Sequence, residues 1–232
     1  MRVAEDGCCA MTIDAKAQAP AGGTSARRIA GPPSERLAAR ISAREATPPS
    51  FLDDLTRLDV AMYRAIAETP TPTLDEPLRR LSNAANHSKL WLMVAGIIGA
   101  LGGTAGRRTA LTAIEAVAIN SLMVNLPMKM LGRRARPDRT AARVSPARHV
   151  PMPKSPSFPS GHAASAFAFV AAVAPTMPAL ARYLRALVYL VGYSRVHTGV
   201  HYPGDVIVGS FIGTAIGESV AYAARRGRFG GR

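Results

Sequence analysis

Five apolar segments follow one another between Leu90 and Ala224, and they constrain the fold more than any other feature of the chain. They cover residues 90–105, 109–128, 161–175, 183–194 and 205–224. A helix needs about 20 mostly apolar residues to cross a bilayer, and two of the segments reach that length without their flanks. Their many glycine, alanine, serine and threonine residues suit close packing of helices in lipid. The sequence therefore predicts an all-α fold, an integral membrane helical bundle with about five transmembrane helices.

A soluble all-helical core is the competing interpretation of the same segments. Five apolar helices in so short a stretch leave little amphipathic surface for water to wet, and we therefore favour the membrane. Glu115 and Glu218 interrupt two of the segments. Because carboxylates are costly in lipid, we expect both side chains to face the bundle interior.

The residues before the apolar segments differ in composition. Residues 1–50 contain no aromatic residue and no sustained apolar face, and they predict a disordered basic tail. Residues 51–88 predict two amphipathic helices, the first with Leu55, Leu58 and Met62 on one stripe and the second starting near Leu74. The chain then divides into the tail (1–50), the amphipathic helices (51–88), a transmembrane domain (89–226) and a basic C-terminal tail (227–232).

The chain carries a formal net charge of +14, from 29 Lys and Arg against 15 Asp and Glu. Such an excess favours a polyanionic partner or an anionic membrane surface. The two cysteines, Cys8 and Cys9, are adjacent, so a disulfide framework and a cysteine-based metal site are both excluded.

Polar residues stand at the ends of the apolar segments. Lys129 and Arg136 follow the second segment, and both cations can face the same way if the helix persists for about two turns. Ser160 is a natural N-cap for the third segment, and the free N–H groups after it form an anion site. His201 and Asp205 flank a Pro-Gly turn that can bring the carboxylate onto the imidazole.

Alternation of the helices brings these residues together. If the five helices cross the membrane in turn, the ends of the second and fourth and the starts of the third and fifth lie on one side. The residues that then converge are Lys129, Arg136, Arg195, Ser160, His162, His201 and Asp205. Each is a weak signal alone, but together they favour phosphate binding and phosphoryl transfer.

The same residues form a three-part pattern that resembles the signature of the type 2 phosphatidic acid phosphatase superfamily. The parts are KMLGRRARP (129–137), PSGH (159–162) and SRVHTGVHYPGD (194–205), each intact in spacing and order. The resemblance covers roughly residues 55–224, and the joint motif is highly specific. The family includes membrane lipid phosphatases, soluble acid phosphatases and vanadium haloperoxidases, and the apolar helices place this chain with the membrane branch.

The resemblance implies a metal-independent phosphatase with a phosphohistidine intermediate. His201 would be the nucleophile, Asp205 would orient its imidazole, and His162 would protonate the leaving group and then activate water. The phosphoryl oxygens would be bound by Lys129, Arg136, Ser160, Gly161 and Arg195. No cofactor and no metal is required, because the cations supply the positive charge.

The motifs recognise a phosphoryl group, whereas helix surfaces recognise the lipid that is attached to it. We expect a polyprenyl phosphate or diphosphate, a polyprenyl-phospho-sugar phosphate, or phosphatidate. The partners are then this lipid phosphate and the membrane lipids, and not nucleic acid, and no oligomeric state follows from the sequence. Two alternatives remain: a relative of the soluble acid phosphatases or haloperoxidases, and a non-enzymatic basic membrane protein.

Chain parity also predicts a topology. The N-terminal tail and all three motifs lie on one membrane face and the C-terminus on the other, in a multi-pass protein of the cell membrane. The resemblance favours the extracytoplasmic face for the active site, whereas the distribution of Lys and Arg does not agree cleanly with it.

Overall fold

A computed structural model of the protein describes residues 32, 34, 35 and 50–229, and these residues form helices and connecting segments without a strand. The main helices are α2 (Phe51–Glu68), α3 (Pro72–Ala84), α4 (Lys89–Leu101), α5 (Gly103–Met123), α6 (Lys129–Leu131), α7 (Gly161–Val173), α8 (Pro178–His197) and α9 (Pro203–Phe229). The all-α prediction is confirmed for this part of the chain. The predicted disordered tail lies almost wholly outside the described residues, as do residues 230–232.

Three short helical turns complete the set: η1 (Asn86–Ser88), η2 (Val124–Met128) and η3 (Pro146–Arg148). η2 is a π-type turn that contains Pro127 and joins α5 directly to α6. Proline lacks the N–H that a helix needs at this point, and a widened turn accommodates it without ending the helix. α5, η2 and α6 therefore form one continuous helical run.

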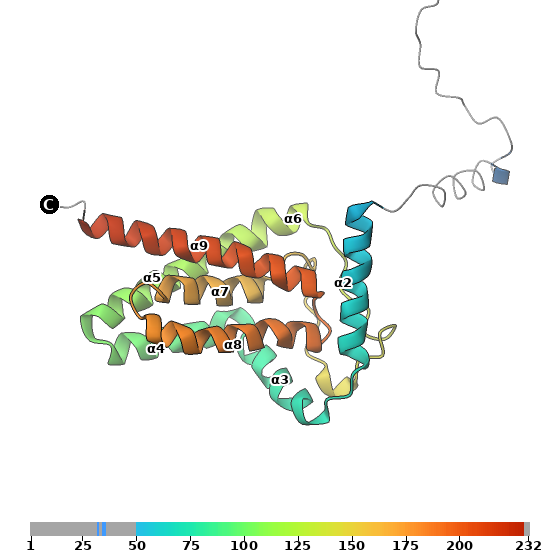
Figure 1. Ribbon diagram of the computed structural model, residues 1–232, viewed down its shortest axis with the longest axis horizontal. Helices are drawn as coiled ribbons and strands as arrows, with labels where there is room; N and C mark the ends of the chain where they lie inside the picture. Colours follow the sequence, from blue (N-terminus) through green and yellow to red (C-terminus); the bar gives the residue numbers. More distant parts are fainter. Residues whose placement is uncertain (1–31, 33, 36–49, 230–232) are drawn as a thin grey trace, which may run out of the picture. The chain divides into compact units, whose positions relative to one another are not determined.

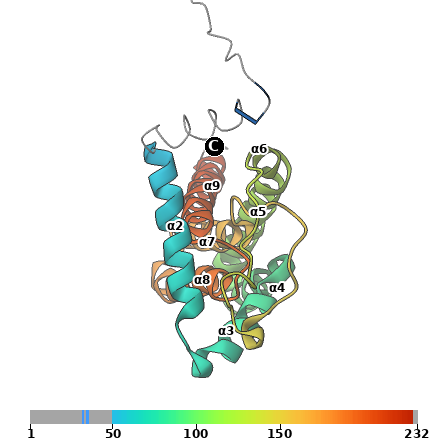
Figure 2. The ribbon, with the colours of Figure 1, turned by 90° about the vertical axis from the view of Figure 1, so that its right-hand side faces the viewer.

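Helices α5, α7, α8 and α9 lie side by side, and α2 crosses one end of this bundle (Figure 1). Figure 2, which looks along the bundle, shows α2 in front of the ends of α8 and α9. The central helix is α7, which contacts α5, α8 and α9 and buries most of its side chains. Its many alanines make this possible, because small side chains let three neighbours approach the same helix.

Two helical runs among the described residues are long and apolar enough to cross a membrane, Gly103–Leu131 and Pro203–Gly227. α7 is apolar but shorter. Each of the five predicted apolar segments nevertheless coincides with a helix: α4, the run from α5 to α6, α7, α8 and α9.

Glycines allow α7 and α9 to touch backbone to backbone. Gly209, Gly213 and Gly217 repeat every four residues along α9 and face α7. A Cβ atom on Gly209 would lie 2.6 Å from the carbonyl oxygen of Ser160, and one on Gly213 would overlap the carbonyl of Ala164. These three glycines, which we call the glycine ladder, set the spacing of the two helices because no side chain stands between them.

Replacing the central glycine of the ladder is expected to destabilise the fold. Gly213→Ala places a methyl group against the α7 backbone, which cannot move aside like a flexible side chain. We expect the thermal midpoint in detergent to fall by about 5 °C, the effect of about 1–3 kcal/mol of overpacking. Gly96→Ala is the control, because a Cβ atom at Gly96 meets nothing within 4 Å. Equal midpoints for the two variants would contradict the ladder.

The predicted amphipathic helices are present as α2 and α3. α2 packs on the rest of the chain through Tyr63 and Ala67, which are buried. The apolar stripe of Leu55, Leu58 and Met62 stays exposed. An exposed apolar stripe on a helix that crosses the end of the bundle is typical of a helix lying at a membrane surface.

The expectation for the two carboxylates within apolar segments is wrong. Glu115 in α5 and Glu218 in α9 both lie on exposed faces of the bundle. The inner face of α9 is instead formed by the glycine ladder. Because both helices are largely apolar around their circumference, periodicity does not show which face packs inward.

Candidate active site

The three sequence motifs meet at one end of the bundle. Lys129 begins α6, Gly161 begins α7, Arg195 lies in the last turn of α8 and Asp205 in the first turn of α9. His201 lies in the short connection between α8 and α9. The structure therefore brings together the helix ends that alternation predicts, and the chemical roles of these residues remain predictions.

His201 is buried, and its Nδ1 atom faces the carboxylate of Asp205 at 3.4 Å from Oδ2. The Ser157 hydroxyl lies 3.4 Å from the same Nδ1 and donates a hydrogen bond to Asp205 Oδ2. The Tyr202 amide donates to that oxygen at 2.9 Å. With a carboxylate beside it, Nδ1 carries the ring proton, which leaves the lone pair on Nε2 free.

The Nε2 atom of His201 faces a cation. Nη1 of Arg136 lies 3.3 Å from it. Burial lowers the pKa of His201 to about 4, although the hydrogen bond with Asp205 opposes this shift. The imidazole is therefore neutral at physiological pH, which is the form in which Nε2 can act as a nucleophile.

Arg134 is a further partner of Asp205 that sequence analysis did not single out. Its Nη1 lies 3.0 Å from Asp205 Oδ1 and 2.7 Å from Oδ2 of Asp59 in α2. Asp59 also accepts a hydrogen bond from the Gly204 amide at 2.7 Å, and the Arg134 guanidinium stacks 4.0 Å above the Tyr202 ring. The start of α9 is thereby fixed to α2, and the Asp205 carboxylate gains a cation as well as two hydrogen-bond donors.

Lys129 and Arg136, the two cations of the first motif, lie close together, but not because they share one face of a helix. The helix ends at Leu131, so the condition that one helical face carries both Lys129 and Arg136 is not met. Both cations instead bind the Ser155 hydroxyl, Lys129 at 3.1 Å and Arg136 at 3.3 Å. The Arg136 guanidinium is fixed further by the carbonyls of Ser155 and Val200.

The third cation, Arg195, is 1% exposed. Its Nη1 donates to the hydroxyl and the carbonyl of Ser82 in α3. Its Nε has no hydrogen-bond partner within the described part of the chain. Leaving a buried charged donor unsatisfied is costly, so this nitrogen is well placed to bind a phosphoryl oxygen.

The start of α7 supplies N–H groups and a histidine. Ser160 is the N-cap, as predicted: its hydroxyl accepts from the Ala163 amide at 3.5 Å. The amide of Ser160 donates to the carbonyl of Asp205 at 2.9 Å, which joins the starts of α7 and α9. His162 lies in the first turn, and its Nε2 is 2.9 Å from Oδ1 of Asn86. The first N–H groups of a helix favour an anion.

Several residues that sequence analysis passed over hold the predicted ones in place. Ser155 and Ser157 lie just before the second motif, and Arg134 lies inside the first, so their nearness to the motifs was an available signal. Ser82 in α3 and Asn86 in η1 also contact site residues, although they lie far earlier in the chain. No local pattern marks these two, because their partners lie on helices that only the fold brings near.

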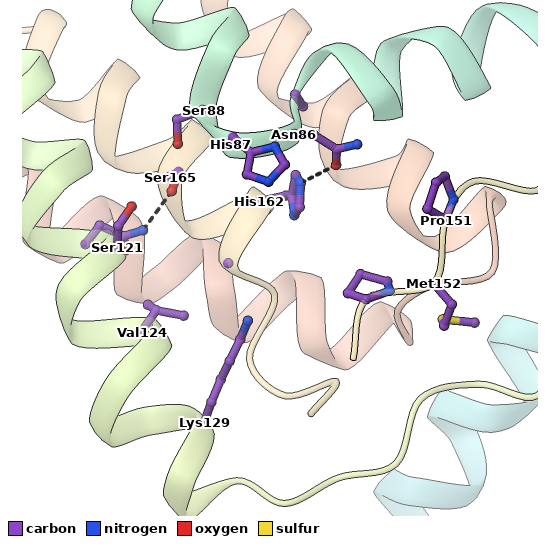
Figure 3. A pocket seen from close by; sticks show the side chains of 14 residues that line it. Asn86, His87, Ser88, Ser121, Val124, Lys129, Pro151, Met152, His162 and Ser165 are labelled. Carbon is purple, nitrogen blue, oxygen red and sulfur yellow. Dashed lines mark hydrogen bonds between the residues drawn. The ribbon is translucent and has the colours of Figure 1, made fainter. Parts of the chain in front are cut away.

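A cavity of about 470 Å³ opens beside His162 and Lys129. Figure 3 shows these two side chains with Ser165 around it, and Pro151 and Met152 along another side. Among the residues that the structure describes, no group of three or more His, Cys, Asp or Glu could hold a metal ion.

Comparison with known proteins gives a family match that covers all three motifs of this chain. The PAP2 superfamily is matched over residues 109–228. The decaprenylphosphoryl-5-phosphoribose phosphatase of Mycobacterium tuberculosis (strain H37Rv) is 34% identical over 174 residues, which are 73% of this chain and 92% of that protein. The lipid A 1-phosphatase of Rhizobium johnstonii is 31% identical over 173 residues, covering 67% of this chain and 68% of that one.

Two solved structures share the fold. LpxE of Aquifex aeolicus has a TM-score of 0.58 and 24% identity, covering 70% of this chain and 94% of that one. The transmembrane PAP2-type phosphatidylglycerolphosphate phosphatase of Bacillus subtilis has a TM-score of 0.55 and 21% identity, covering 85% and 95%. These structures support the arrangement of helices. The chain belongs to the PAP2 superfamily.

Proposed function

We propose that this protein is a membrane lipid phosphatase that hydrolyses a lipid phosphomonoester or diphosphate through a phosphohistidine intermediate. The observation that carries the proposal is the buried, neutral His201, with the Asp205 carboxylate behind Nδ1 and the Arg136 guanidinium in front of Nε2. Membership of the superfamily, and relatives named as phosphatases of lipids, support the same activity.

In the first step, Nε2 of His201 attacks phosphorus and the bond from phosphorus to the leaving oxygen breaks. His162 gives its proton to that oxygen, so the lipid leaves as an alcohol, or as a monophosphate where the substrate is a diphosphate. The His201 ring becomes positively charged, and Asp205 stabilises it. Ser157 and Arg134 keep the carboxylate in place while this charge develops.

In the second step, water attacks the phosphorus of the phosphohistidine. The neutral His162 takes a proton from this water, and the phosphorus–nitrogen bond breaks. The products are inorganic phosphate and a neutral His201, and the proton on His162 restores the acid for the next turnover.

The phosphoryl oxygens lie among Lys129, Arg136 and Arg195 in this proposal, with the Ser160 hydroxyl and the Gly161 N–H at the start of α7. Among the described residues, the Nε of Arg195 has no hydrogen-bond partner, so this donor is available to a phosphoryl oxygen. Donors fixed in advance inside a partly buried site stabilise transition-state charge more than they would in water.

For the substrate, we favour a polyprenyl-phospho-sugar phosphate over a plain polyprenyl phosphate, a polyprenyl diphosphate or phosphatidate. The support is a relative named as a decaprenylphosphoryl-5-phosphoribose phosphatase, of which this chain covers 92%. The test is phosphate release by the purified protein from a panel of these lipids, with His201→Ala as the control. Release from none of them would overturn the proposed function.

Activity is expected to survive EDTA and to be inhibited by vanadate. Lys129, Arg136 and Arg195 supply the positive charge that a metal supplies in other phosphatases. Vanadate adopts the five-coordinate geometry of the transferring phosphoryl group and can occupy the same place. Phosphate release would be measured with excess chelator and in a vanadate titration. Strict dependence on added magnesium, without a vanadate effect, would indicate different chemistry.

We also propose that α4, the run from α5 to α6, α7, α8 and α9 each cross the membrane. The connection from α6 to α7 and the connection from α8 to α9 then lie on the active-site face. The connections from α4 to α5 and from α7 to α8 lie together at the other end, where a Cβ atom on Gly102 would be 3.1 Å from Met177 Cε.

Cysteine labelling is expected to distinguish the two ends of the bundle. Ala147→Cys places a thiol on the active-site face and Thr104→Cys places one at the opposite end, and both positions are exposed. In a background with Cys8 and Cys9 replaced by serine, a membrane-impermeant reagent should label only one of the two variants in intact cells. The family resemblance favours Ala147→Cys as the labelled one. Equal labelling in intact cells would contradict five spans, and detergent should make both react.

A further inference from the structure

The cavity beside His162 extends beyond the groups that the proposed mechanism uses. His162, Lys129 and Gly161 lie at its rim near the reacting phosphate, whereas Asn120 and Ser165 line it without a part in either step. Asn120 lies on α5 and Ser165 on α7, and their side chains are joined by a hydrogen bond of 3.1 Å from Nδ2 to Oγ. Figure 3 shows this bond as the dashed line at Ser165.

The position of Ser165 connects this pair to the leaving group. Ser165 is three residues after His162 on α7, so both side chains face the same side of the helix, about one turn of 5.4 Å apart. His162 protonates the leaving oxygen in the proposed mechanism. A leaving group that extends from His162 into the cavity meets Ser165 and Asn120, which line the same cavity.

Asn120 has an unmet hydrogen-bonding requirement. The residue is fully buried in a largely apolar helix, and its Oδ1 has no hydrogen-bond partner among residues 50–229. An unsatisfied buried amide oxygen costs about 1–3 kcal/mol. If the amide is flipped, its oxygen faces Ser165 and its NH₂ group lacks a partner instead. In either orientation one polar group of Asn120 is unsatisfied. A hydroxyl group satisfies both cases, because it can donate and accept.

The rest of the lining suits a ring with polar edges. Asn86, Ser88 and Ser121 add amide and hydroxyl groups, while Pro151 and Met152 form an apolar wall. The acyl chains of a diacylglycerol or a plain polyprenyl chain offer no hydroxyl group to the polar part of this lining. A sugar ring offers hydroxyl groups at its edge and apolar C–H groups on its face.

We propose that this cavity is a subsite for a polyhydroxylated leaving group, in which Asn120 and Ser165 bind ring hydroxyls of a sugar attached to the phosphate. The subsite rests on the proposed function, since it binds the leaving group that His162 protonates. Asn120 and Ser165 are then specificity residues: they select among lipid phosphates without taking part in bond making or breaking.

The experiment compares two substrates that differ only in these hydroxyls: a short-chain polyprenylphosphoryl-5-phosphopentose and its 2,3-dideoxy counterpart. For the wild type we expect kcat/KM to be about tenfold higher with the hydroxylated compound, as for the loss of one or two hydrogen bonds to a buried polar site. Asn120→Leu keeps the side-chain size and should lower kcat/KM about tenfold for the hydroxylated compound while changing the dideoxy compound by less than about twofold.

Thr109→Val is the matched control, because Thr109 is also a buried polar residue of α5, bonded to Thr176 at the far end of the bundle. It should leave the preference for the hydroxylated compound unchanged. Ser165→Ala is a second and smaller change, and it should reduce the preference in the same direction as Asn120→Leu.

Equal turnover of the two compounds by the wild type would overturn the subsite, with the proposed function intact. The subsite would also be overturned if Ser165→Ala folded normally and kept the full wild-type preference. Absence of phosphate release from both compounds and from the whole lipid panel would instead overturn the proposed function. These outcomes separate a failure of the subsite from a failure of the enzyme assignment.

Discussion

His201→Ala is expected to reduce phosphate release by roughly four orders of magnitude or more, to the level of the assay background. The reason is that Nε2 of His201 forms the bond to phosphorus in the proposed mechanism, and alanine offers no atom that can replace it. The imidazole is buried, neutral and aligned by Asp205 in the free protein, so its loss removes a nucleophile that is already in position. The measurement is the rate with the best lipid of the panel.

A histidine outside the site provides the control for this variant. His149→Ala removes an exposed imidazole whose Nε2 lies 3.2 Å from the Val144 carbonyl, and it should retain activity within about twofold. Both variants should elute from size exclusion like the wild type. A folded His201→Ala protein with wild-type activity would rule out the phosphohistidine mechanism.

The second large effect is expected for Asp205→Asn, which should lose about three to four orders of magnitude in kcat and keep a measurable remainder. The carboxylate forms no bond to phosphorus, but it fixes the ring proton on Nδ1 and stabilises the charge that develops on His201. An amide in its place presents an N–H group to Nδ1, Ser157 or Arg134, all of which need an acceptor. The fitting measurement is single-turnover kinetics, which report the chemical step directly.

Ser157→Ala is a smaller change in the same hydrogen-bond network around Asp205. The hydroxyl donates to Asp205 but is only one of its partners, so its removal should cost about tenfold in kcat. If Asp205→Asn were no more damaging than Ser157→Ala, the carboxylate would be a structural group and the proposed role would be wrong.

Two local features of the site could be predicted from the sequence, because their signal is carried by residue types at fixed spacing near helix ends. Ser160 is the N-cap of α7, and His201 and Asp205 lie together across the Pro-Gly turn. The partners of these residues were not predicted. Asn86, which bonds His162, and Asp59, which bonds the Gly204 amide, come from far away in the chain, and a hydrogen bond between distant segments leaves no local pattern.

The fold shows the same division. The number and order of apolar helices followed from composition, since each segment is a helix of the structure. Composition did not predict which face of α5 or α9 packs inward, and Glu115 and Glu218 lie on exposed faces. A helix that is apolar all round shows no preferred face, and only the contacts of its small residues decide which side packs. The end of α6 at Leu131 likewise depends on where the following segment binds Ser155.

The glycine ladder between α7 and α9 also determines from which side a lipid can reach the phosphate. His162 lies in the first turn of one of these helices and Asp205 in the first turn of the other, and the two backbones approach closely along the ladder. A lipid chain cannot enter between helices whose main chains touch. The cavity beside His162 lies on another flank of α7, where α5 and η1 contribute to its lining.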